Sequence, residues 1–262
     1  MSQVLFHPCG AAPGTGALVA RHPAAPALQR WISCYYTVTI ARAGERTEVR
    51  ALPDGCADLI FHFGDSPEGW FGGPRTRPSV YQHRGPTQLL GVQLRPGAAY
   101  PLIGRPIRQF ADHSCPLQHL GIEWIEAALL QLATVGDLPV RLALMDRLLV
   151  GRFASAAMDP RLRGALDLVI ETGGNAAVQQ LARKARTSSR HLSRLFAIWV
   201  GLTPKQLSRI VRFQQVMDSH AKRRSRDWAR LAAEFHYADQ SHLVRDVAAF
   251  AGLTPRALFS ST

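Results

Sequence analysis

A segment that occurs twice near the C-terminus constrains the fold of this chain more than any other feature. Residues 191–204 read HLSRLFAIWVGLTP and residues 242–255 read HLVRDVAAFAGLTP, a shift of 51 positions. Each copy follows a short helical pattern that opens with Leu-Ala, at Leu181 and at Leu231. This repeat predicts two similar helix–turn–helix units, which a long helix between them can present to one face of DNA. Such an arrangement is typical of a DNA reader and not of a catalyst.

Positive charge is concentrated in the same region. The chain has 262 residues, enough for two domains, and a formal net charge of +12. Residues 160–262 hold 17 Lys+Arg against 7 Asp+Glu, a net of +10, whereas residues 1–159 hold 14 against 12, a net of +2. This asymmetry predicts a nearly neutral sensor joined to a domain that binds a polyanion, although a positive surface can also serve solubility alone.

Several sequence features bear on compartment and metal binding. No apolar run reaches the ~18 residues of a membrane-spanning helix, and the first residues lack the pattern of a signal peptide. The 4 cysteines lie apart without CxxC spacing, which favours reduced thiols over disulfides or a zinc site. His7, His62, His83, His113 and His119 show no metal-ligand spacing. We therefore expect a cytoplasmic protein that carries no metal and no cofactor.

The first part of the chain is predicted to be mainly β, either barrel-like or a strongly bent sheet. Aromatic, β-branched and apolar runs predict strands over residues 34–40, 57–63 and 88–94, with Pro and Gly between them. Residues 1–30 are rich in Pro, Gly and Ala and are expected to form an irregular lead-in.

From about residue 117 the apolar spacing becomes helical. It predicts helices over residues 122–133 and 139–153, both packed on the β domain. The second has more apolar positions than one buried face requires, so it is either an ordinary buried helix or part of a dimer interface.

The domain boundary is predicted near Met158-Asp159-Pro160, because Asp159 can cap a helix and proline suits its first turn. We expect an N-terminal regulatory domain over residues 1–158 and an all-α DNA-binding domain over residues 159–262, with helix–turn–helix units at about 175–200 and 227–251. Asn175 is expected to cap the helix that follows it.

The exposed faces of the two predicted recognition helices carry side chains that can read bases. Arginine can donate two parallel hydrogen bonds to guanine, glutamine can pair with adenine, and valine can contact the methyl group of thymine. Elsewhere Arg209 and the basic run at 222–226 can reach phosphates, although such residues are also common on solvated surfaces and Arg212 can instead link the two units. The predicted DNA-binding residues are Arg190, Ser193, Arg194, Arg209, Lys222, Arg223, Arg224, Gln240, Ser241, His242, Val244 and Arg245.

Residues 175–260 resemble the DNA-binding domain of the AraC family of bacterial transcriptional regulators. The motifs that carry the resemblance are LARKARTSSRHLSRLF, GLTPKQLSRIVRFQ and LAAEFHYADQSHLVRDVAAFAGLTP. The resemblance implies that the two units read successive major-groove segments, about 34 Å apart. The chain departs from the family in three places: Arg186 and His236 stand where each tight turn usually has glycine, and Val247 replaces the usual phenylalanine.

Residues 30–120 are similar to an N-terminal domain found on a subset of these regulators, through LPDGCADLIF, GGPRTRP and GVQLRPGAAYPLIG. This similarity implies a regulatory domain that can bind an effector. The candidate ligand-binding residues are Asp54, Cys56, Arg75, Arg77, Arg95 and Tyr100. Cys56 is also a candidate for a thiol sensor, although Asp54 and Asp58 oppose formation of its thiolate.

These features predict a sequence-specific transcriptional regulator rather than an enzyme. The chain contains no P-loop, nucleophile elbow or dinucleotide fingerprint. Two alternatives stay open: an enzyme or thiol-based sensor in the β domain that carries a DNA-targeting module, and a non-specific DNA binder. The expected partners are double-stranded promoter or operator DNA, a small-molecule effector, a second copy of the chain and, for an activator, RNA polymerase. When bound to DNA, the protein would be associated with the nucleoid.

Overall fold

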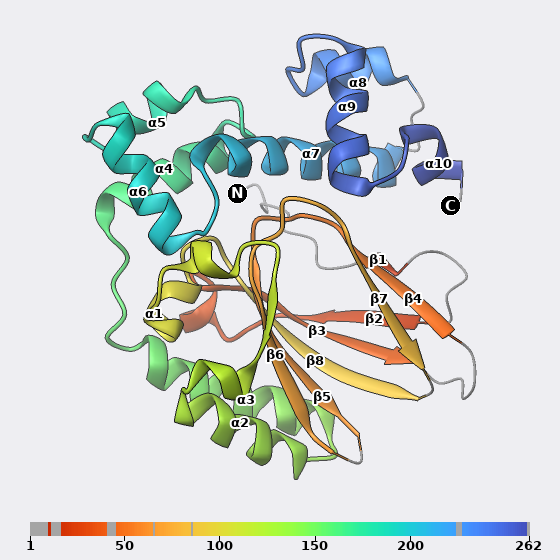
Figure 1. Ribbon diagram of the computed structural model, residues 1–262, viewed down its shortest axis with the longest axis vertical. Helices are drawn as coiled ribbons and strands as arrows, with labels where there is room; N and C mark the ends of the chain where they lie inside the picture. Colours follow the sequence, from red (N-terminus) through yellow and green to blue (C-terminus); the bar gives the residue numbers. More distant parts are fainter. Residues whose placement is uncertain are drawn as a thin grey trace.

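The computed structural model describes residues 10–11, 17–40, 46–64, 66–84, 86–223 and 227–260. Two antiparallel sheets and the first helices form the lower part of the molecule in Figure 1, and the remaining helices form a layer above them. The expected combination of a mainly β N-terminal region and an all-α C-terminal region is therefore confirmed.

The larger sheet has six strands and is not closed. Its strands, in spatial order, are β2 (Ala17–His22), β3 (Ile32–Ile40), β8 (Thr87–Leu94), β5 (Ala57–Phe63), β6 (Glu68–Gly72) and β9 (Ser114–Pro116). The smaller sheet contains β1 (Gly10–Ala11), β4 (Arg46–Ala51) and β7 (Ser79–Arg84). Of the two forms considered for this domain, the structure has open, packed sheets and not a closed barrel.

The expected irregular lead-in is wrong for residues 17–28. Strand β2 pairs along its whole length with β3, and a short 3-10 helix, η1 (Pro26–Leu28), follows it. The surrounding Ala- and Pro-rich sequence hides this edge strand, because β2 itself offers only one β-branched residue, Val19.

The six-stranded sheet buries both faces, and its side chains alternate between them. Tyr35 and Leu59 pack with the helices, whereas Tyr36 and Leu89 face the smaller sheet. Gly91 lets the ring of Tyr36 lie directly on β8, since a Cβ atom at this position would be 2.0 Å from Tyr36 Cζ. The alternation gives this domain two separate apolar layers.

Helices cover the outer face of this sheet. These elements are α1 (Ala99–Ile103), η2 (Ile107–Phe110), η3 (Leu117–Leu120), α2 (Glu123–Ala133) and α3 (Leu138–Phe153). Asp137 caps α3 by accepting a hydrogen bond from Val140 N at 3.0 Å. The ring of Phe153 stacks on Trp31, with centroids 4.9 Å apart. Both helices predicted from the change of period are therefore confirmed.

The C-terminal layer contains seven described helices. They are α4 (Pro160–Glu171), α5 (Val178–Lys184), α6 (Ser189–Trp199), α7 (Pro204–Arg223), α8 (Trp228–Glu234), α9 (Gln240–Ala251) and α10 (Pro255–Ser260). Within the described ranges, none of the helices combines the length and apolarity needed to cross a membrane.

Side-chain caps fix the starts of several of these helices, and the cap predicted at Asp159 is confirmed. Asp159 accepts a hydrogen bond from Arg161 N at 2.9 Å, and Asp227 accepts one from Arg230 N at 2.9 Å. The prediction for Asn175 is wrong: Ala177 occupies the N-cap of α5, and its N–H donates to Gln180 Oε1 at 2.7 Å. A glutamine three residues into the helix therefore supplies the cap that asparagine was expected to give.

The tight turn of each helix–turn–helix unit keeps a left-handed residue without glycine. Arg186 has φ 49° and His236 has φ 56°. The left-handed conformation costs a non-glycine residue roughly 1–2 kcal/mol. Glycine avoids this cost, but its greater freedom in the unfolded chain lowers the stability of the fold by roughly 0.5–1 kcal/mol. These positions therefore hold a small amount of strain.

We expect Arg186→Gly and His236→Gly each to stabilise the protein slightly, by about 0.5 kcal/mol, in chemical denaturation. The control is Arg183→Gly inside α5, which should destabilise the protein by about 1 kcal/mol. Loss of more than about 1 kcal/mol at either turn would show that the side chain, and not its backbone strain, dominates there.

The β domain is held against the helical layer at several points. Gln214 Nε2 of α7 donates to Pro53 O at 2.5 Å, and Arg50 Nη1 donates to Ala251 O, at the end of α9, at 3.2 Å. At the end of α6, the ring of Trp199 packs on Tyr100 with centroids 4.5 Å apart. The N-terminal domain therefore contacts the C-terminal ends of α6 and α9 and the middle of α7.

Candidate nucleic-acid interface

Helix α6 separates a buried apolar face from an exposed polar face. Ser188 caps it by accepting a hydrogen bond from His191 N at 3.2 Å. The residues that it buries are Leu192, Leu195 and Phe196. The exposed residues of its N-terminal half include Arg190, Ser193 and Arg194. These three side chains face solvent, and the contact of Trp199 with Tyr100 of the β domain lies at the opposite end of the helix.

Helix α9 repeats this arrangement in the second unit. Asp239 caps it by accepting a hydrogen bond from His242 N at 2.6 Å. The apolar residues that it buries are Leu243, Val247, Phe250 and Ala251. The exposed residues include Gln240, Ser241 and Arg245, while His242 and Val244 are half-buried. The smaller Val247 is fully enclosed in the core, so its departure from the family pattern leaves the helix packed.

An ion pair links the connecting helix α7 to α9. Arg209 Nη2 lies 2.6 Å from Asp246 Oδ1, and the Arg209 guanidinium also lies 5.1 Å from the ring centroid of Phe250. The Asp246 side chain is 2% exposed, but that of Arg209 remains 37% exposed. Arg209 therefore holds the second unit on the connector, and part of its side chain still faces the surface on which a phosphate contact was predicted.

Arg212 joins the two units through backbone atoms. Its Nη2 donates to Gly174 O at 3.3 Å, and its Nη1 donates to His236 O at 3.3 Å. The structural role considered for this residue is therefore present, through two carbonyl groups and not through a carboxylate.

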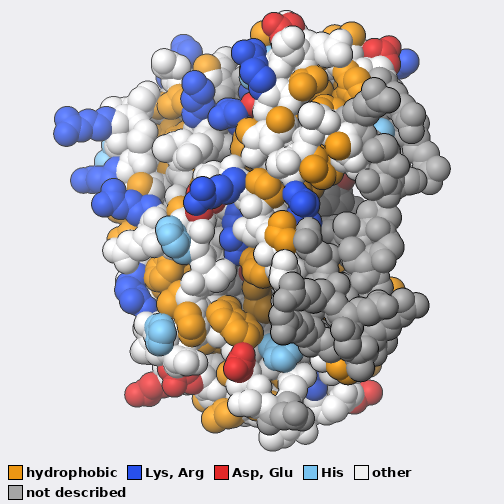
Figure 2. Space-filling view, turned by 45° about the vertical axis from the view of Figure 1, so that its right-hand side comes forward, with side chains coloured by type: hydrophobic (Ala, Val, Ile, Leu, Met, Phe, Trp, Pro, Cys, Tyr) orange, Lys and Arg blue, Asp and Glu red, His pale blue; other side chains and the backbone are white. Residues whose placement is uncertain are grey.

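A basic groove lies between the units. Its volume is about 610 Å³, and it is bounded by the turn before α5, the first half of α7 and the exposed side of α9. Figure 2 shows Lys and Arg side chains gathered in the upper part of the molecule, where Figure 1 places the C-terminal helices. The charged and titratable residues along the groove are Lys205, Arg209, Arg212, His242, Arg245 and Asp246.

The basic run predicted to contact phosphates is only partly covered by the structure. Lys222 and Arg223 are the last residues of α7, and their side chains lie outside the described set. Arg224 lies outside the described residues altogether. The phosphate contacts of these three residues stay a prediction from the sequence.

Residues 181–261 match the profile of a family described as "Helix-turn-helix domain". The match spans both recognition helices and the connector between them. The C-terminal region is an AraC-type helix–turn–helix domain. DNA binding is the activity of such a domain, and the resemblance seen in the repeated sequence is confirmed.

The remaining comparisons concern the N-terminal region and the whole chain. Residues 20–116 match "Domain of unknown function (DUF6597)". No curated protein sequence is detectably similar to this chain.

Some solved structures are similar over most of the chain. ToxT from Vibrio cholerae O395 is 7% identical, with 94% of this chain and 96% of that chain covered and a TM-score of 0.42. ToxT bound to (E)-4-(8-methylnaphthalen-1-yl)but-3-enoic acid is 11% identical, with coverages of 94% and 98% and a TM-score of 0.43. The AraC-like transcriptional activator CuxR is 11% identical, with coverages of 81% and 89% and a TM-score of 0.22. At such low TM-scores these likenesses carry no conclusion about the activity of this chain.

In the domain that precedes the AraC-type domain, three predicted ligand-binding residues line one small polar cavity of about 40 Å³: Asp54, Cys56 and Arg75. Asp54 accepts hydrogen bonds from Cys56 N at 2.8 Å and from Gln93 Nε2 at 2.6 Å. Arg75 donates to Ser79 Oγ at 2.6 Å, to Ser114 Oγ at 2.9 Å and to the hydroxyl of Tyr81. This cavity has the size of a few water molecules, so it does not fit an organic effector.

Cys56 is poorly suited to sense oxidants or alkylating agents. The residue is 2% exposed and belongs to the apolar cluster that includes the core of the AraC-type domain. Burial raises the pKa of its thiol well above the ordinary value, and the charges of Asp54 and Asp58 raise it further. Because the thiolate is the reactive form, Cys56 is expected to be inert in the folded protein.

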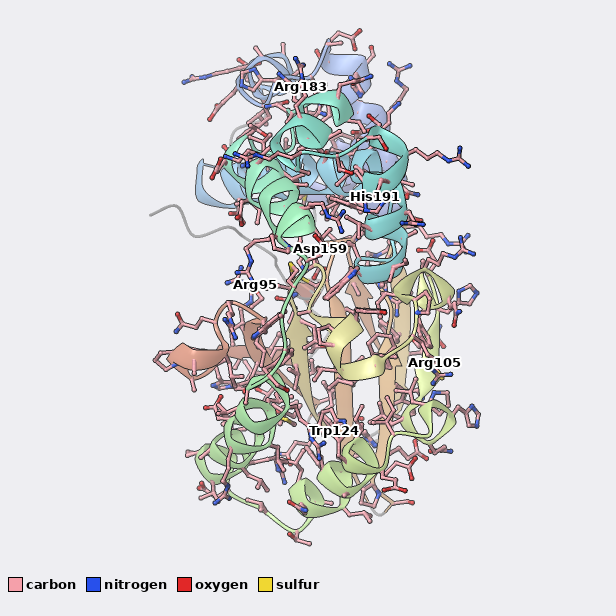
Figure 3. All side chains as sticks on the ribbon, turned by 90° about the vertical axis from the view of Figure 1, so that its left-hand side faces the viewer. Arg95, Arg105, Trp124, Asp159, Arg183 and His191 are labelled. Carbon is pink, nitrogen blue, oxygen red and sulfur yellow. The ribbon has the colours of Figure 1, made fainter. Side chains whose placement is uncertain are left out.

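The other predicted ligand-binding residues lie in different places. Arg77 is exposed in the turn before β7, and Tyr100 packs on Trp199 of the AraC-type domain. Arg95 lies near the junction of the two domains, at about the height of Asp159 in Figure 3, and its Nε donates to Gln29 O at 2.8 Å. The six residues therefore do not form one site. Among the described residues, no group of three or more potential metal ligands comes together.

A larger cavity, which the sequence did not indicate, lies between the two sheets. Its volume is about 390 Å³. Because its residues come from seven strands, each contributing one or two side chains, no short motif marks it. They are Tyr36, Val38, Val49, Ile60, His62, Glu68, Trp70, Tyr81, Gln82, Leu89 and Ser114.

The buried carboxyl group of Asp54 predicts a pH-dependent stability. Burial raises its pKa from 3.8 to about 6, although hydrogen bonds from Cys56 and Gln93 and the charge of Arg75 oppose the shift. A raised pKa in the folded state means that protonation stabilises the fold. This contribution is fully present below about pH 4 and is lost as the pH rises through about 6.

We therefore expect Asp54→Asn, which has no titrating group, to gain thermal stability relative to the natural protein between about pH 5 and pH 7.5. The control is Asp159→Asn. Because the hydrogen bond from Arg161 lowers the pKa of the Asp159 carboxyl, the difference in thermal stability between this variant and the natural protein should stay constant over this range. A difference between Asp54→Asn and the natural protein that does not change with pH would contradict the account of Asp54.

Proposed function

We propose that the protein is a sequence-specific transcriptional regulator whose two recognition helices read neighbouring major-groove segments. The single observation that carries this proposal is the matched pair of helices, α6 and α9, on either side of α7. Each buries its apolar face and leaves arginine and other polar side chains exposed in its N-terminal half. The connector α7 has 20 residues and is about 30 Å long, close to the ~34 Å of one DNA turn.

Each predicted DNA-binding side chain has a role in this proposal. Arg190, Arg194 and Arg245 donate to guanine, Gln240 pairs with adenine, and Val244 contacts a thymine methyl group. Ser193, Ser241 and His242 contact base edges or the backbone. Phosphate contacts come from Arg209, Lys222, Arg223 and Arg224, and they raise affinity without sequence preference.

Competition between DNAs tests this function. A preferred site is first isolated by selection from random duplexes, and its binding is then measured against an excess of unrelated duplex at fixed salt. A regulator should prefer its site by roughly 10³-fold or more. Equal affinity for both DNAs would instead identify a non-specific DNA binder.

We further propose that the N-terminal domain adjusts DNA binding through a ligand, a dimer contact or both. The cavity of about 390 Å³ between the sheets lies within the ~300–1,000 Å³ range of small-molecule sites. On the outer helices, Leu130, Val140 and Val150 are large apolar side chains exposed to solvent, which suits contact with a second copy. We also propose that the protein acts in the bacterial cytoplasm and that, if it is an activator, it contacts RNA polymerase. The buried thiol of Cys56 disfavours a thiol sensor. The matched DNA-binding domain disfavours an enzyme.

A further inference from the structure

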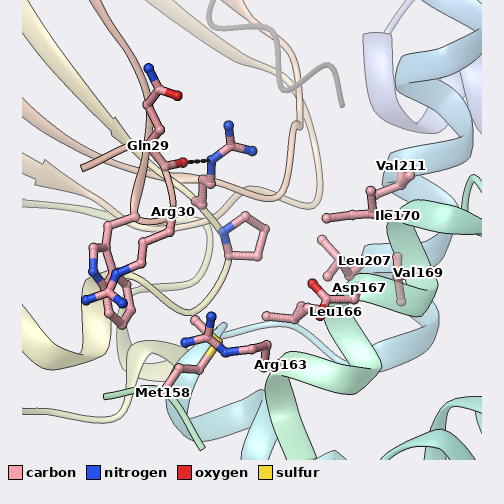
Figure 4. A pocket seen from close by; sticks show the side chains of 13 residues that line it. Gln29, Arg30, Met158, Arg163, Leu166, Asp167, Val169, Ile170, Leu207 and Val211 are labelled. Atoms are coloured by element: carbon pink, nitrogen blue, oxygen red, sulfur yellow. Dashed lines mark hydrogen bonds between the residues drawn. The ribbon is translucent and has the colours of Figure 1, made fainter. Parts of the chain in front are cut away.

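A further pocket lies at the junction of the two domains. It is separate from the cavity between the sheets. Its volume is about 230 Å³. Figure 4 shows Gln29 and Arg30 of the β domain on one side and Leu166, Ile170 and Val211 of the helical domain on the other. We call it the junction pocket.

The walls of the junction pocket are apolar and come from the helices that support the DNA-binding units. Leu166 and Ile170 belong to α4, and Val211 belongs to α7. Met158, in the segment that joins the domains, closes the pocket. The domains are close here, since a Cβ atom at Gly97 would lie 2.8 Å from Met158 Cε.

Three guanidinium groups and one carboxylate surround these walls. Arg163 projects from α4 toward Met158 in Figure 4, and its guanidinium group makes no hydrogen bond or ion pair within the described part of the chain. Arg95 uses its Nε to reach Gln29 O at 2.8 Å, which leaves both terminal nitrogens without a described partner. Arg30 lies over the ring of Trp31, 5.1 Å from its centroid. Asp167 is the one carboxylate among the lining residues. Burial raises the pKa of Asp167, and the charge of Arg163 opposes this shift.

A buried polar atom also lies beside the junction pocket. Trp31 lines the junction pocket and is 1% exposed, yet its indole Nε1–H has no hydrogen-bond partner among the described residues. Buried tryptophan N–H groups ordinarily find an acceptor.

We propose that the junction pocket binds a small amphipathic carboxylate. The guanidinium groups of Arg163 and Arg95 supply forked donors that match a carboxylate, and the apolar walls take the hydrocarbon part. Because about 230 Å³ is smaller than the pockets of drug-sized molecules, the ligand is a short-chain or single-ring acid.

The position of this site couples it to DNA binding, a step that rests on the function proposed above. The ligand would contact the β domain together with α4 and α7, and α7 sets the separation of the two recognition helices. A ligand that favours one seating of the β domain on α7 changes DNA affinity, and DNA must then change ligand affinity by the same factor.

Binding of defined probes to the full-length protein tests the site without DNA. Benzoate, 3-phenylpropionate and octanoate are titrated by calorimetry up to about 10 mM, with 3-phenylpropionamide and phenethylamine as the uncharged and cationic matches. We expect at least one of the acids to bind with a Kd near or below 1 mM, and the matches to bind at least tenfold more weakly.

Variants locate the binding. Arg163→Gln should weaken binding of the acid about tenfold, and Arg95→Gln should also weaken it, because each removes a charge-assisted hydrogen bond. Arg161→Gln is the matched control: this exposed arginine lies on the same helix but pairs with Asp159 at 2.7 Å, and its loss should leave binding unchanged. Val49→Phe, which narrows the cavity between the sheets, should also leave binding unchanged.

The proposal is overturned if no acid binds, if the amine binds best, or if Arg163→Gln binds as tightly as the natural protein. Loss of binding in Val49→Phe alone would also overturn it, by placing the acid between the sheets. The outcomes for DNA are separate, since failure to prefer any DNA would remove the proposed regulator function and leave the probe result standing.

Discussion

Arg194→Ala is expected to weaken binding to the preferred DNA site about tenfold to a hundredfold, and to relax base choice at one position of that site. The side chain is exposed near the middle of α6, on the face opposite to Leu192 and Phe196. A bidentate contact between arginine and guanine contributes roughly 1–3 kcal/mol of discrimination, which is the origin of this range. Within the described ranges its one side-chain hydrogen bond joins Nη2 to His191 Nδ1 at 3.1 Å, so the substitution should leave the fold intact.

Two controls separate base reading from general attraction to DNA. Lys222→Ala should weaken binding to all DNA similarly and reduce the salt dependence by about one ion. Arg147→Ala, at an exposed position on α3 of the β domain, should change neither affinity nor specificity. Equal and sequence-independent losses from Arg194→Ala and Lys222→Ala would contradict direct reading by Arg194.

Gly174→Ala is expected to destabilise the protein by about 3 kcal/mol or more. This residue has φ 80° and ends the turn after α4, where its N–H donates to Val169 O at 2.8 Å. A Cβ atom there would lie 2.0 Å from Ser208 O, in the backbone of α7, so α4 and α7 would have to move apart. The left-handed strain of alanine adds to this overpacking.

The matched control is Gly151→Ala inside α3, where an added Cβ atom meets nothing within 4 Å. Alanine favours a helix over glycine, so this variant should gain about 1 kcal/mol. Chemical denaturation of both variants, monitored by circular dichroism, gives the two changes. A loss below about 1 kcal/mol for Gly174→Ala would mean that α4 and α7 are not packed as closely as described.

Elements with strong local signals were predictable from the sequence. Residues 57–63 form β5 with the predicted bounds. This strand was predictable because a short apolar run indicates a buried strand without knowledge of its neighbours in the sheet. The two recognition helices followed from the repeated segment that contains them. By contrast, β4 and β7 are short, polar strands, RTEVRA and SVYQHR, and their pairing in the smaller sheet identifies them.

The functional surface was predictable only where one helix contains all of it. Exposure of Arg190 and Arg194 follows from their position opposite the apolar face of α6. The ion pair of Arg209 with Asp246 could not be predicted, since its two residues belong to separate helices. The junction pocket likewise combines Trp31 with Val211, and no local pattern connects residues so far apart.

Hydroxyl-radical footprinting on the selected duplex tests the central claim most directly. If α6 and α9 are inserted side by side, the protein should protect two segments on one face of the DNA, with centres about one helical turn, or ~34 Å, apart. The Arg194→Ala variant should lose protection of one segment first. Protection of a single segment, or uniform protection that does not depend on sequence, would contradict the arrangement of two recognition helices on one connector.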